Sequence, residues 1–367
     1  MKKRVVVGLS GGVDSAVTAW LLKQQGHEVI GIFMKNWEED DDDEYCSSNI
    51  DFVDAAAVAD VLGIELEHVN FAAEYKDRVF AEFLREHRAG RTPNPDVLCN
   101  AEIKFKAFLD HAIRLGADHI ATGHYARARE RDGRFELLKG LDPLKDQSYF
   151  LHRLTQPQLA RTWFPIGELP KTEVRRLAAE IGLPNAAKKD STGICFIGER
   201  PFRAFLERYL ANQPGLVKDD HGRTIGEHVG LSFYTLGQRK GIGIATGDPL
   251  YVVRIDADKA EVIVGPREAL ATQSFALRDL NWLGDMAVAD WPEQGLEVAV
   301  RVRSTRPPRS ALLTHGPDGA QVMLAEPEQG VSPGQACVIY EDEAPGARVL
   351  GGGIIRASAA RTLAMAS

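Results

Sequence analysis

The apolar run Val5 to Val7 leads into Gly8-Leu9-Ser10-Gly11-Gly12-Val13-Asp14-Ser15. From Ala16 to Gln25 the apolar residues recur at helical spacing, and Gly26 follows, as is common just after a helix. The pattern predicts a strand, a glycine turn and a helix. Glycines let the backbone approach a ligand, and a helix start offers amide donors and the positive end of its dipole. The stretch therefore predicts a phosphate-binding turn.

The sequence of this turn differs from the motifs of the better-known nucleotide-binding loops. Neither Gly-x-x-x-x-Gly-Lys-Ser/Thr nor Gly-x-Gly-x-x-Gly is present. Ser10 to Ser15 instead resembles the PP-loop of the ATP pyrophosphatase superfamily, which cleaves ATP between its α and β phosphates and adenylates a carbonyl oxygen. The resemblance implies ATP, with Mg²⁺, as the cofactor. The alternative is a glycine turn that only begins a helix.

Length and composition indicate a globular enzyme of several domains. The chain has 367 residues, of which 44% are hydrophobic and 26% charged, so two or three domains are expected. No apolar run approaches the ~18 residues that span a membrane. The basic start Met1 to Arg4 is followed by only a short apolar segment, Val5 to Leu9, which argues against a signal peptide. We expect a cytoplasmic location and no membrane partner.

The net charge of −8 does not exclude a nucleic-acid partner. Glu38 to Glu44 supplies seven negative charges, so the remainder of the chain carries about −1. We expect this acidic run to be a loop, because it lacks the glycine and spacing of a calcium site. Basic clusters occur elsewhere, and such clusters are more often solvated faces than phosphate sites. Charge alone therefore neither indicates nor excludes a nucleic-acid partner.

Strands alternating with helices as far as residue 123 predict a doubly wound parallel sheet of the α/β class. Ligands bind at the carboxyl ends of such strands, where Met34 and Gly123 fall with the glycine turn. The segment 222–247 holds seven glycines and little periodicity, which indicates a small central domain. Apolar residues then alternate with period two and predict a C-terminal β-barrel. The expected domains are 1–200, catalytic; 201–268, central; and 269–360, the barrel.

Two of the four cysteines stand out by their surroundings. Asn94 could cap a helical turn beginning at Pro95, which would put Asp96 and Cys99 on one face. Cys195 follows Lys188 and Lys189, whose charges would favour a thiolate. Each cysteine could equally be a small buried hydrophobe. No Cys-x-x-Cys pair is present, and no protein metal site is predicted.

Seven motifs together make the resemblance more specific: the chain is similar to bacterial tRNA-specific 2-thiouridylases along nearly its whole length. The motifs are Ser10 to Ser15, Met34-Lys35-Asn36-Trp37, Asn94 to Asn100, Gly123-His124-Tyr125-Ala126, Lys145-Asp146-Gln147-Ser148-Tyr149, Ser191-Thr192-Gly193-Ile194-Cys195-Phe196, and Gly237-Gln238-Arg239-Lys240-Gly241.

The resemblance implies roles for individual residues. ATP would be bound by Gly8, Leu9, Ser10, Gly11, Gly12, Val13, Asp14, Ser15, Met34 and Gly123. The target base would meet Asn94, Pro95 and Asp96, and further tRNA contacts would come from His124, Lys145, Asp146, Gln147, Arg301, Val302 and Gln335. Asp96 would act as general acid/base, Cys195 would carry sulfur as a persulfide, and Cys99 would form a transient disulfide with Cys195.

The substrate implied by the resemblance is tRNA for Lys, Glu or Gln, whose wobble uridine would be adenylated at its C2 oxygen and then thiolated. The sulfur would arrive from a sulfur-carrier protein or a cysteine desulfurase relay. One departure is visible, because Arg301-Val302-Arg303 stands where the family commonly has Arg-Tyr-Arg. A stacking contact with tRNA is therefore lost at Val302, whereas the chemistry is unaffected. We expect structural roles for Cys46 and Cys337.

Two alternatives remain open at this stage. The first is another PP-loop adenylating enzyme, such as a 2-thiocytidine or 4-thiouridine synthase or an amide-forming ligase. A ligase would have no need for the pair Cys99 and Cys195. The second is a non-catalytic module that binds an adenine nucleotide or RNA, in which Cys195 would be dispensable. The joint presence of phosphate loop, acid and paired thiols favours an enzyme.

Overall fold

The computed structural model describes residues 1–38, 48–190, 202–244, 248–316 and 319–356. The chain divides into two compact units. The first comprises Met1–Ala81, Pro95–Arg200 and Ala344–Leu350, and the second comprises Glu82–Asn94, Pro201–Glu343 and Gly351–Ser367.

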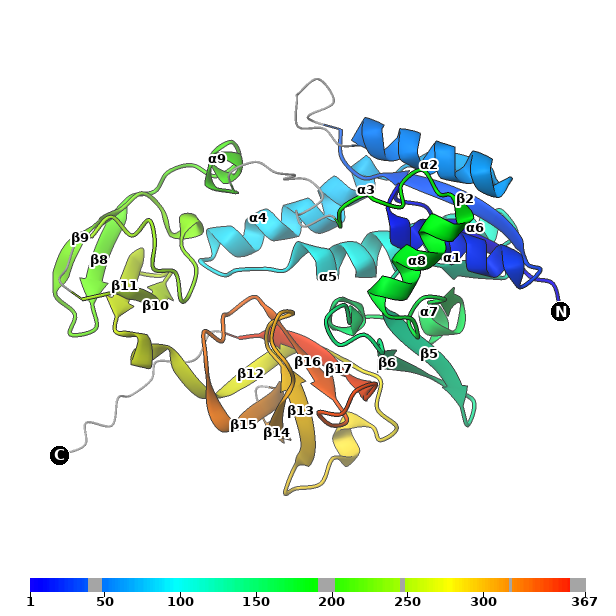
Figure 1. Ribbon diagram of the computed structural model, residues 1–367. Coiled ribbons are helices and arrows are strands. Elements are labelled where there is room, and N and C mark those ends of the chain that lie inside the picture. The colour runs from blue at the N-terminus through cyan, green and yellow to red at the C-terminus, as the bar shows by residue number, and fades with distance from the viewer. Residues whose placement is uncertain (39–47, 191–201, 245–247, 317–318, 357–367) are drawn as a thin grey trace. The chain divides into compact units, whose positions relative to one another are not determined.

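A five-stranded parallel sheet is the centre of the first unit (Figure 1). The strands lie in the order β3-β2-β1-β4-β7, and each neighbouring pair is parallel. Their bounds are β1 Arg4–Gly8, β2 Glu28–Lys35, β3 Glu65–Asn70, β4 His119–Ala121 and β7 Thr162–Trp163. The chain reverses direction across the sheet after β3, since β4 lies beside β1 on its other side. The prediction of a doubly wound parallel sheet is confirmed.

Helices cover both faces of this sheet. Val5, Val7 and Leu9 belong to one buried cluster with residues of α1 (Val13–Gln24), α2 (Ser48–Leu62) and α8 (Lys171–Ile181). Gly8 points the other way and lies against Phe108, the first residue of α6 (Phe108–Arg114). The remaining helical segments are α3 Ala72–Tyr75, η1 Lys76–Phe80, α4 Ala81–Arg88, α5 Pro95–Cys99, η2 Asn100–Ala107, η3 Ser148–Leu151 and α7 Gln156–Ala160. Within the described residues, no helix is both long and apolar enough to cross a membrane.

Sequence reasoning did not predict the antiparallel hairpin β5 (Ala126–Arg131) and β6 (Arg134–Lys139). Its strands are rich in charged residues, so they lack the apolar alternation by which the other strands were found. The charges are paired instead: Glu136 is buried, and Arg129 and Arg348 lie 2.5 and 3.1 Å from its carboxylate. Ion pairs to the buried Glu136 carboxylate thus replace part of the apolar packing at this hairpin.

A small mixed sheet in the second unit has the order β10-β11-β8-β9. Its strands are β8 Gly215–Asp219, β9 Thr224–His228, β10 Tyr251–Asp256 and β11 Glu261–Gly265, and α9 Phe202–Glu207 and η4 Leu231–Phe233 belong to the same part of the chain. Val217, Val252, Val262 and Val264 form its core with Tyr234 and Ile242. β10 and β11 pair as an antiparallel hairpin. Strand β9 lies within 222–247, the segment whose sequence showed little periodicity, and the predicted small central domain is confirmed.

A closed β-barrel follows, as predicted. The strands have the order β12-β15-β14-β13-β16-β17, and β17 pairs back to β12. Their bounds are β12 Ala271–Trp282, β13 Leu296–Arg301, β14 Arg309–Gly316, β15 Gly319–Gln329, β16 Ala336–Tyr340 and β17 Arg348–Ile355; the short helices η5 Arg267–Leu270 and η6 Val288–Asp290 flank or interrupt them. All five residues of β16 are buried, which places this strand at the core of the barrel.

Cys337 lies on β16 with no exposed surface, and burial raises the pKa of its thiol well above the ordinary value. It is therefore a protonated core residue. We expect Cys337→Ser to lower the free energy of unfolding by about 1 to 3 kcal/mol, because a hydroxyl loses more than a thiol when it is removed from water. Urea denaturation would measure this, with Cys337→Ala as the apolar control. A serine variant at least as stable as the alanine variant would contradict the assignment.

Candidate active site

The predicted phosphate-binding turn links β1 to α1. Helix α1 begins at Val13, three residues earlier than predicted, and Gly12 is its N-cap. Gly11 has φ +73°, and a Cβ at this position would collide with the carbonyl oxygen of Asp51, so only glycine fits without strain. The Ser15 hydroxyl donates to Gly12 O at 3.0 Å and accepts from Ser10 N at 3.2 Å. The side chains of the motif therefore hold the shape of the turn itself.

Two residues predicted at the ends of other strands lie at this turn. A Cβ on Gly8 would be 3.1 Å from the terminal carbon of Met34. A Cβ on Gly123 would be 2.7 Å from Ser15 N, so Gly123 lets the end of β4 approach the start of α1. The structure thus brings together the segments to which ATP binding was assigned. The individual ATP contacts stay predictions.

Asp14 begins a chain of charged groups that sequence reasoning did not find. Lys171 Nζ lies 2.7 and 2.8 Å from the two carboxylate oxygens of Asp14, and the Tyr125 hydroxyl donates to Asp14 at 2.8 Å. Lys171 is also 2.8 Å from Asp190. Asp190 in turn pairs with Lys145 at 2.7 Å and with Arg175 at 2.9 Å.

This charged cluster, defined as Asp14, Lys145, Lys171, Arg175 and Asp190, contains three cations and two carboxylates. Burial would raise the pKa of Asp190, but hydrogen bonds and the charges of Lys145 and Lys171 outweigh it and lower the pKa to about 2. Asp190 is thus ionised at neutral pH, and three cations against two carboxylates give the cluster a formal net positive charge beside the turn. Such a field favours a polyphosphate ligand.

Lys188 forms two ion pairs, with Nζ 2.7 Å from Asp51 and 2.5 Å from Asp54. Because Cys195 lies outside the described residues, the expected effect of Lys188 on its thiol stays a prediction. Asn185, three residues before it, donates to Gly11 O at 2.9 Å and thereby fixes the back of the turn.

The predicted catalytic pair Asp96 and Cys99 lies on α5, which begins at Pro95 as expected. Burial raises the pKa of Asp96, and the positive charge of Lys104 opposes the shift only in part. Cys99 is 2% exposed. A carboxyl group with a raised pKa is better suited to exchange a proton near neutral pH than an ordinary aspartate. The roles of both side chains, and those of Asn94 and Pro95 toward the base, stay predictions.

Cys195 and Cys46 lie outside the described residues, so the pairing of Cys99 with Cys195 also stays a prediction. Among the described residues, no group of three or more His, Cys, Asp or Glu could hold a metal ion.

Four residues predicted to contact tRNA also make contacts inside the first unit. His124 is buried, its Nδ1 is 2.8 Å from the Thr122 hydroxyl, and burial holds its pKa well below 6.5. Asp146 accepts from the backbone of Gly140 and Ser148 at 3.0 and 3.1 Å. The remaining two, Lys145 and Gln147, bind Asp190 and the Tyr125 backbone, respectively. A neutral His124 would meet RNA as a polar, uncharged ring.

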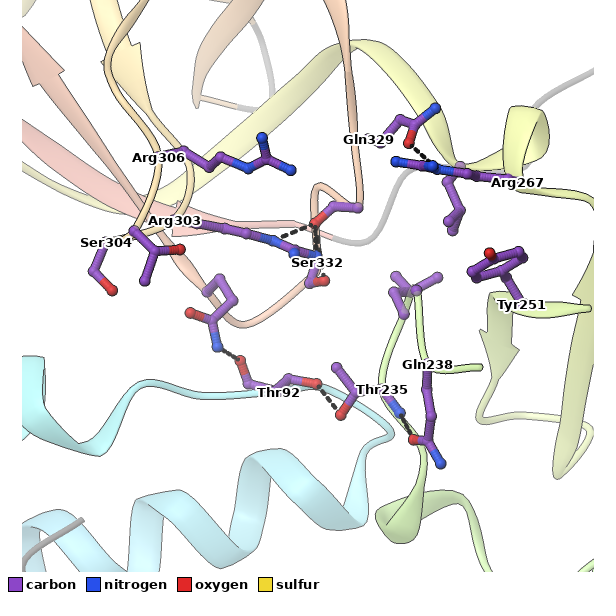
Figure 2. Close-up of a pocket in the computed structure, with 16 residues that line it drawn as sticks. Thr92, Thr235, Gln238, Tyr251, Arg267, Arg303, Ser304, Arg306, Gln329 and Ser332 are labelled. Atoms are coloured by element: carbon purple, nitrogen blue, oxygen red, sulfur yellow. Dashed lines mark hydrogen bonds between the residues drawn. The ribbon is translucent and has the colours of Figure 1, made fainter. Parts of the chain in front are cut away.

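The predicted tRNA contacts of the barrel lie in the second unit. Arg301 and Val302 are 8% and 5% exposed, and Arg301 donates to Ser304 O. Gln335 Nε2 donates to Thr92 O at 2.8 Å and lines the pocket drawn in Figure 2. Of the three, Gln335 alone is a lining residue of that pocket.

Comparison with known proteins agrees with this architecture. The family model described as tRNA methyl transferase HUP domain matches residues 3–199; those described as tRNA methyl transferase PRC-barrel domain and aminomethyltransferase beta-barrel domain match 203–266 and 272–355. A protein from Delftia acidovorans named tRNA-specific 2-thiouridylase MnmA is 62% identical over 374 residues, which covers 97% of this chain and 98% of the relative. The chain belongs to the tRNA-specific 2-thiouridylase family.

Other 2-thiouridylases are similarly close. Those of Leptothrix cholodnii and Ralstonia pickettii are 63% and 60% identical, each with 97% of both chains covered. Among solved structures, the U34-tRNA thiolase NcsA from Methanococcus maripaludis has a TM-score of 0.34 and 23% identity, over 50% of this chain and 58% of that one. The domain boundaries given from sequence, 1–200, 201–268 and 269–360, stay a prediction.

The raised pKa of Asp96 gives a test by pH. The folded protein binds this proton more tightly than the unfolded chain does, so stability decreases relative to a neutral side chain as pH rises through the folded pKa. We expect Asp96→Asn to be more stable than wild type near pH 7, with a gain that shrinks toward pH 4. Unfolding by urea across this range would measure the gain.

Asp190→Asn is the matched control, because its effect has the opposite sign. The pKa of Asp190 is lowered, so its contribution to stability is present at neutral pH and is lost as pH falls toward about 2. Asp190→Asn should therefore destabilise the protein at pH 7. If Asp96→Asn also destabilised the protein at pH 7, with the same pH dependence as Asp190→Asn, the burial assigned to Asp96 would be contradicted.

Proposed function

We propose that the chain is a tRNA-uridine 2-sulfurtransferase that uses ATP to replace the C2 oxygen of the wobble uridine, position 34, with sulfur in tRNAs for Lys, Glu and Gln. The main support is that the Gly8 to Ser15 turn, Gly123 and the charged cluster lie next to one another in a chain that belongs to the 2-thiouridylase family. The reaction takes place in the cytoplasm, with sulfur supplied by a sulfur-carrier protein or a cysteine desulfurase relay.

The turn suits ATP by its shape and its charge. Gly11 and Gly12 have no side chain to obstruct a phosphate, and the first amides of α1 have no partner inside the helix. The charged cluster adds a net positive charge near this helix start, because its member Asp14 lies in the first turn of α1. Lys171 could move from Asp14 to a phosphate oxygen, while Tyr125 keeps Asp14 in place. Mg²⁺ would enter the site bound to the phosphates of ATP.

The first chemical step makes the C2 oxygen of uridine a leaving group. This oxygen attacks the α-phosphorus of ATP, the bond to pyrophosphate breaks, and uridine becomes an O-adenylate. A carbonyl oxygen leaves poorly, whereas AMP leaves well. The cations of the cluster stabilise the charge that develops on pyrophosphate. Asp96, whose raised pKa suits proton exchange near neutral pH, would act as general acid/base at the base.

The second step delivers sulfur. The terminal sulfur of a persulfide on Cys195 attacks C2 and AMP departs. Cys99 as thiolate then attacks the Cys195 sulfur, which breaks the persulfide S–S bond, leaves sulfur on C2 and forms a Cys99–Cys195 disulfide. A thiol reductant restores both cysteines. Cys99 is almost fully buried, so water has little access to the thiol before the base arrives.

Lys171 tests the phosphate role of the charged cluster. We expect Lys171→Met to weaken ATP binding about tenfold or more, because the variant leaves the Asp14 carboxylate unpaired next to the triphosphate. Isothermal titration calorimetry would measure the change. Lys188→Met is the control, since Lys188 makes equally short ion pairs with Asp51 and Asp54. Equal ATP affinity in wild type and Lys171→Met would contradict the role.

The thiolation proposal is tested in cells. A strain lacking its 2-thiouridylase is complemented with wild type, Cys99→Ser, Cys195→Ser or Asp96→Asn, and tRNA nucleosides are analysed by mass spectrometry. We expect 2-thiouridine derivatives only with wild type and with the control variants Cys46→Ser and Cys337→Ala. Restoration by either Cys99→Ser or Cys195→Ser would overturn the persulfide mechanism. Thiocytidine or 4-thiouridine in place of 2-thiouridine would indicate another PP-loop thiolase.

A further inference from the structure

Lys104 is a charged residue beside the candidate active site to which the reaction described above gives no role. It lies on η2, the π-helix that follows α5, and it is half-buried. Within the described part of the chain, Lys104 makes no ion pair and no hydrogen bond. Lys106, two residues later, is exposed and pairs with Glu102 at 2.8 Å. A half-buried ammonium group without a carboxylate partner bears a desolvation cost, which indicates a function at this place.

The backbone places Lys104 on the same face as Asp96. Helix α5 continues into η2 without a break, because Cys99 at the junction has helical backbone angles (φ −58°, ψ −46°). In an α-helix, a residue eight positions after Asp96 would be rotated by about 80° around the axis. The turns of η2 are wider, since their hydrogen bonds join residues five apart, and this reduces the rotation. Asp96, Asn100 and Lys104 therefore follow one another along one face.

Asn100, between the other two, has a buried acceptor atom without a partner. The residue is 3% exposed, and its Nδ2 donates to Phe150 O at 3.2 Å. Its Oδ1 is buried and has no hydrogen-bond partner among the described residues. Buried polar atoms are nearly always hydrogen-bonded in native proteins. A donor on a bound substrate would satisfy this atom, which supports a binding site along this face.

The charge of Lys104 acts on two residues of the candidate site. Burial raises the pKa of Asp96, and the Lys104 charge counteracts part of this rise. Burial lowers the pKa of His124, and the same charge lowers it further. The ring of His124 lies 5.8 Å from that of Phe105, the residue after Lys104. Lys104 is therefore close both to Asp96 and to the segment that follows β4.

The elements packed against α5 supply the other ionisable groups near Asp96. These elements are η1, η2 and η3. Their ionisable residues are Lys76, Asp77 and Arg78 on η1, Glu102, Lys104 and Lys106 on η2, and Tyr149 on η3. Of these, Lys104 acts on the Asp96 carboxylate. Replacement of this lysine should thus alter the acid–base behaviour of Asp96 without breaking an ion pair of the described residues.

We propose that Lys104 is a positioning residue of the thiolation reaction, whose ammonium group keeps Asp96 as a carboxylate so that Asp96 can take the proton from N3 of the uridine. This inference rests on the proposed function and adds to it the group that prepares the base.

The proton taken by Asp96 is returned within one cycle. When the C2 oxygen bonds to the α-phosphorus, pyrophosphate leaves, the electron pair of the N3–H bond forms the N3–C2 double bond, and the proton passes to Asp96. The persulfide sulfur then displaces AMP from C2, and Cys99 attacks the Cys195 sulfur. The electron pair of the broken S–S bond stays on the sulfur at C2. N3 takes the proton back from Asp96, which is again a carboxylate.

The pH dependence of adenylation tests the role of Lys104. It is measured as single-turnover release of pyrophosphate by the full-length enzyme with ATP and an unmodified tRNA-Glu transcript, without a sulfur donor. In wild type the rate should rise with pH as Asp96 loses its proton. Lys104→Met should move the midpoint of this rise up by about one pH unit, because a cation near the carboxylate is lost. The rate then falls about tenfold at the acidic end and approaches that of wild type at the alkaline end.

Three further variants separate charge from structure. Lys104→Arg keeps the positive charge and should keep the wild-type midpoint. Lys106→Met removes a cation two residues away on the same helix and should leave the whole profile unchanged. Lys104→Gln is a second neutral variant with a polar side chain, so a folding defect caused by methionine would not prevent the measurement.

A double-mutant cycle of stability tests the same coupling without activity. Lys104→Met raises the pKa of Asp96 in the folded protein further, so the carboxylate costs more stability near pH 7. The gain from Asp96→Asn should therefore be larger in the Lys104→Met background than in wild type. Urea unfolding of the four proteins measures the difference. The same cycle with Lys106→Met should show none.

Three results would overturn the inference. The first is a rate of Lys104→Met that is lowered equally at every pH, as expected of a purely structural residue. The second is an unchanged midpoint with weaker binding of ATP or tRNA, which would make Lys104 a phosphate contact. The third is an equal gain from Asp96→Asn in both backgrounds. Failure of the proposed function is distinguishable, since wild type would then release no tRNA-dependent pyrophosphate, whereas the stability cycle can still be measured.

Discussion

The close approach of two strand ends is the constraint on which the first unit depends. Gly123 lies just after β4. It fits against the start of α1 only because it lacks a side chain, since a Cβ would be 2.7 Å from Ser15 N and 2.8 Å from the carbonyl carbon of Asp14. The parallel order of β1 and β4 brings these segments together at their carboxyl ends. Because Tyr125 follows two residues later and hydrogen-bonds Asp14, the same approach also fixes the acid of the turn.

The charged cluster links segments that are far apart in sequence. Asp14, Lys171 and Asp190 come from the turn, the first residue of α8 and the segment after it, yet their side chains are within 3 Å of one another in pairs. Charges that are held this closely in a half-buried site need partners, because an unpaired ion there would bear a desolvation cost. Lys171 pairs with both Asp14 and Asp190, so the turn and the segment before Ser191 share one set of ion pairs. A phosphate that entered near Asp14 would compete for this lysine.

Sequence reasoning found the parts of the fold whose signal is local. The turn at Gly8 to Ser15, the parallel sheet and the alternating strands of the barrel follow from apolar period and glycine placement. It missed the β5–β6 hairpin, because ion pairs to the buried Glu136 replace apolar alternation there. It also missed Tyr125, Lys171 and Asp190 as members of the site, since no spacing relates residues 14, 125, 171 and 190. The ion pairs of Lys188 with Asp51 and Asp54 could not be predicted for the same reason.

The cations of this chain differ in whether they already have carboxylate partners. In the charged cluster, the lysines already have carboxylate partners, so an incoming phosphate exchanges one ion pair for another and its net gain is small. A ligand that must be bound, cleaved and released in each cycle suits such a site. Arg303 of the second unit differs, because among the described residues it donates to the carbonyl oxygen of Gly330 and pairs with no carboxylate. An anion that reached this guanidinium would displace no ion pair, so the whole attraction would be added to binding.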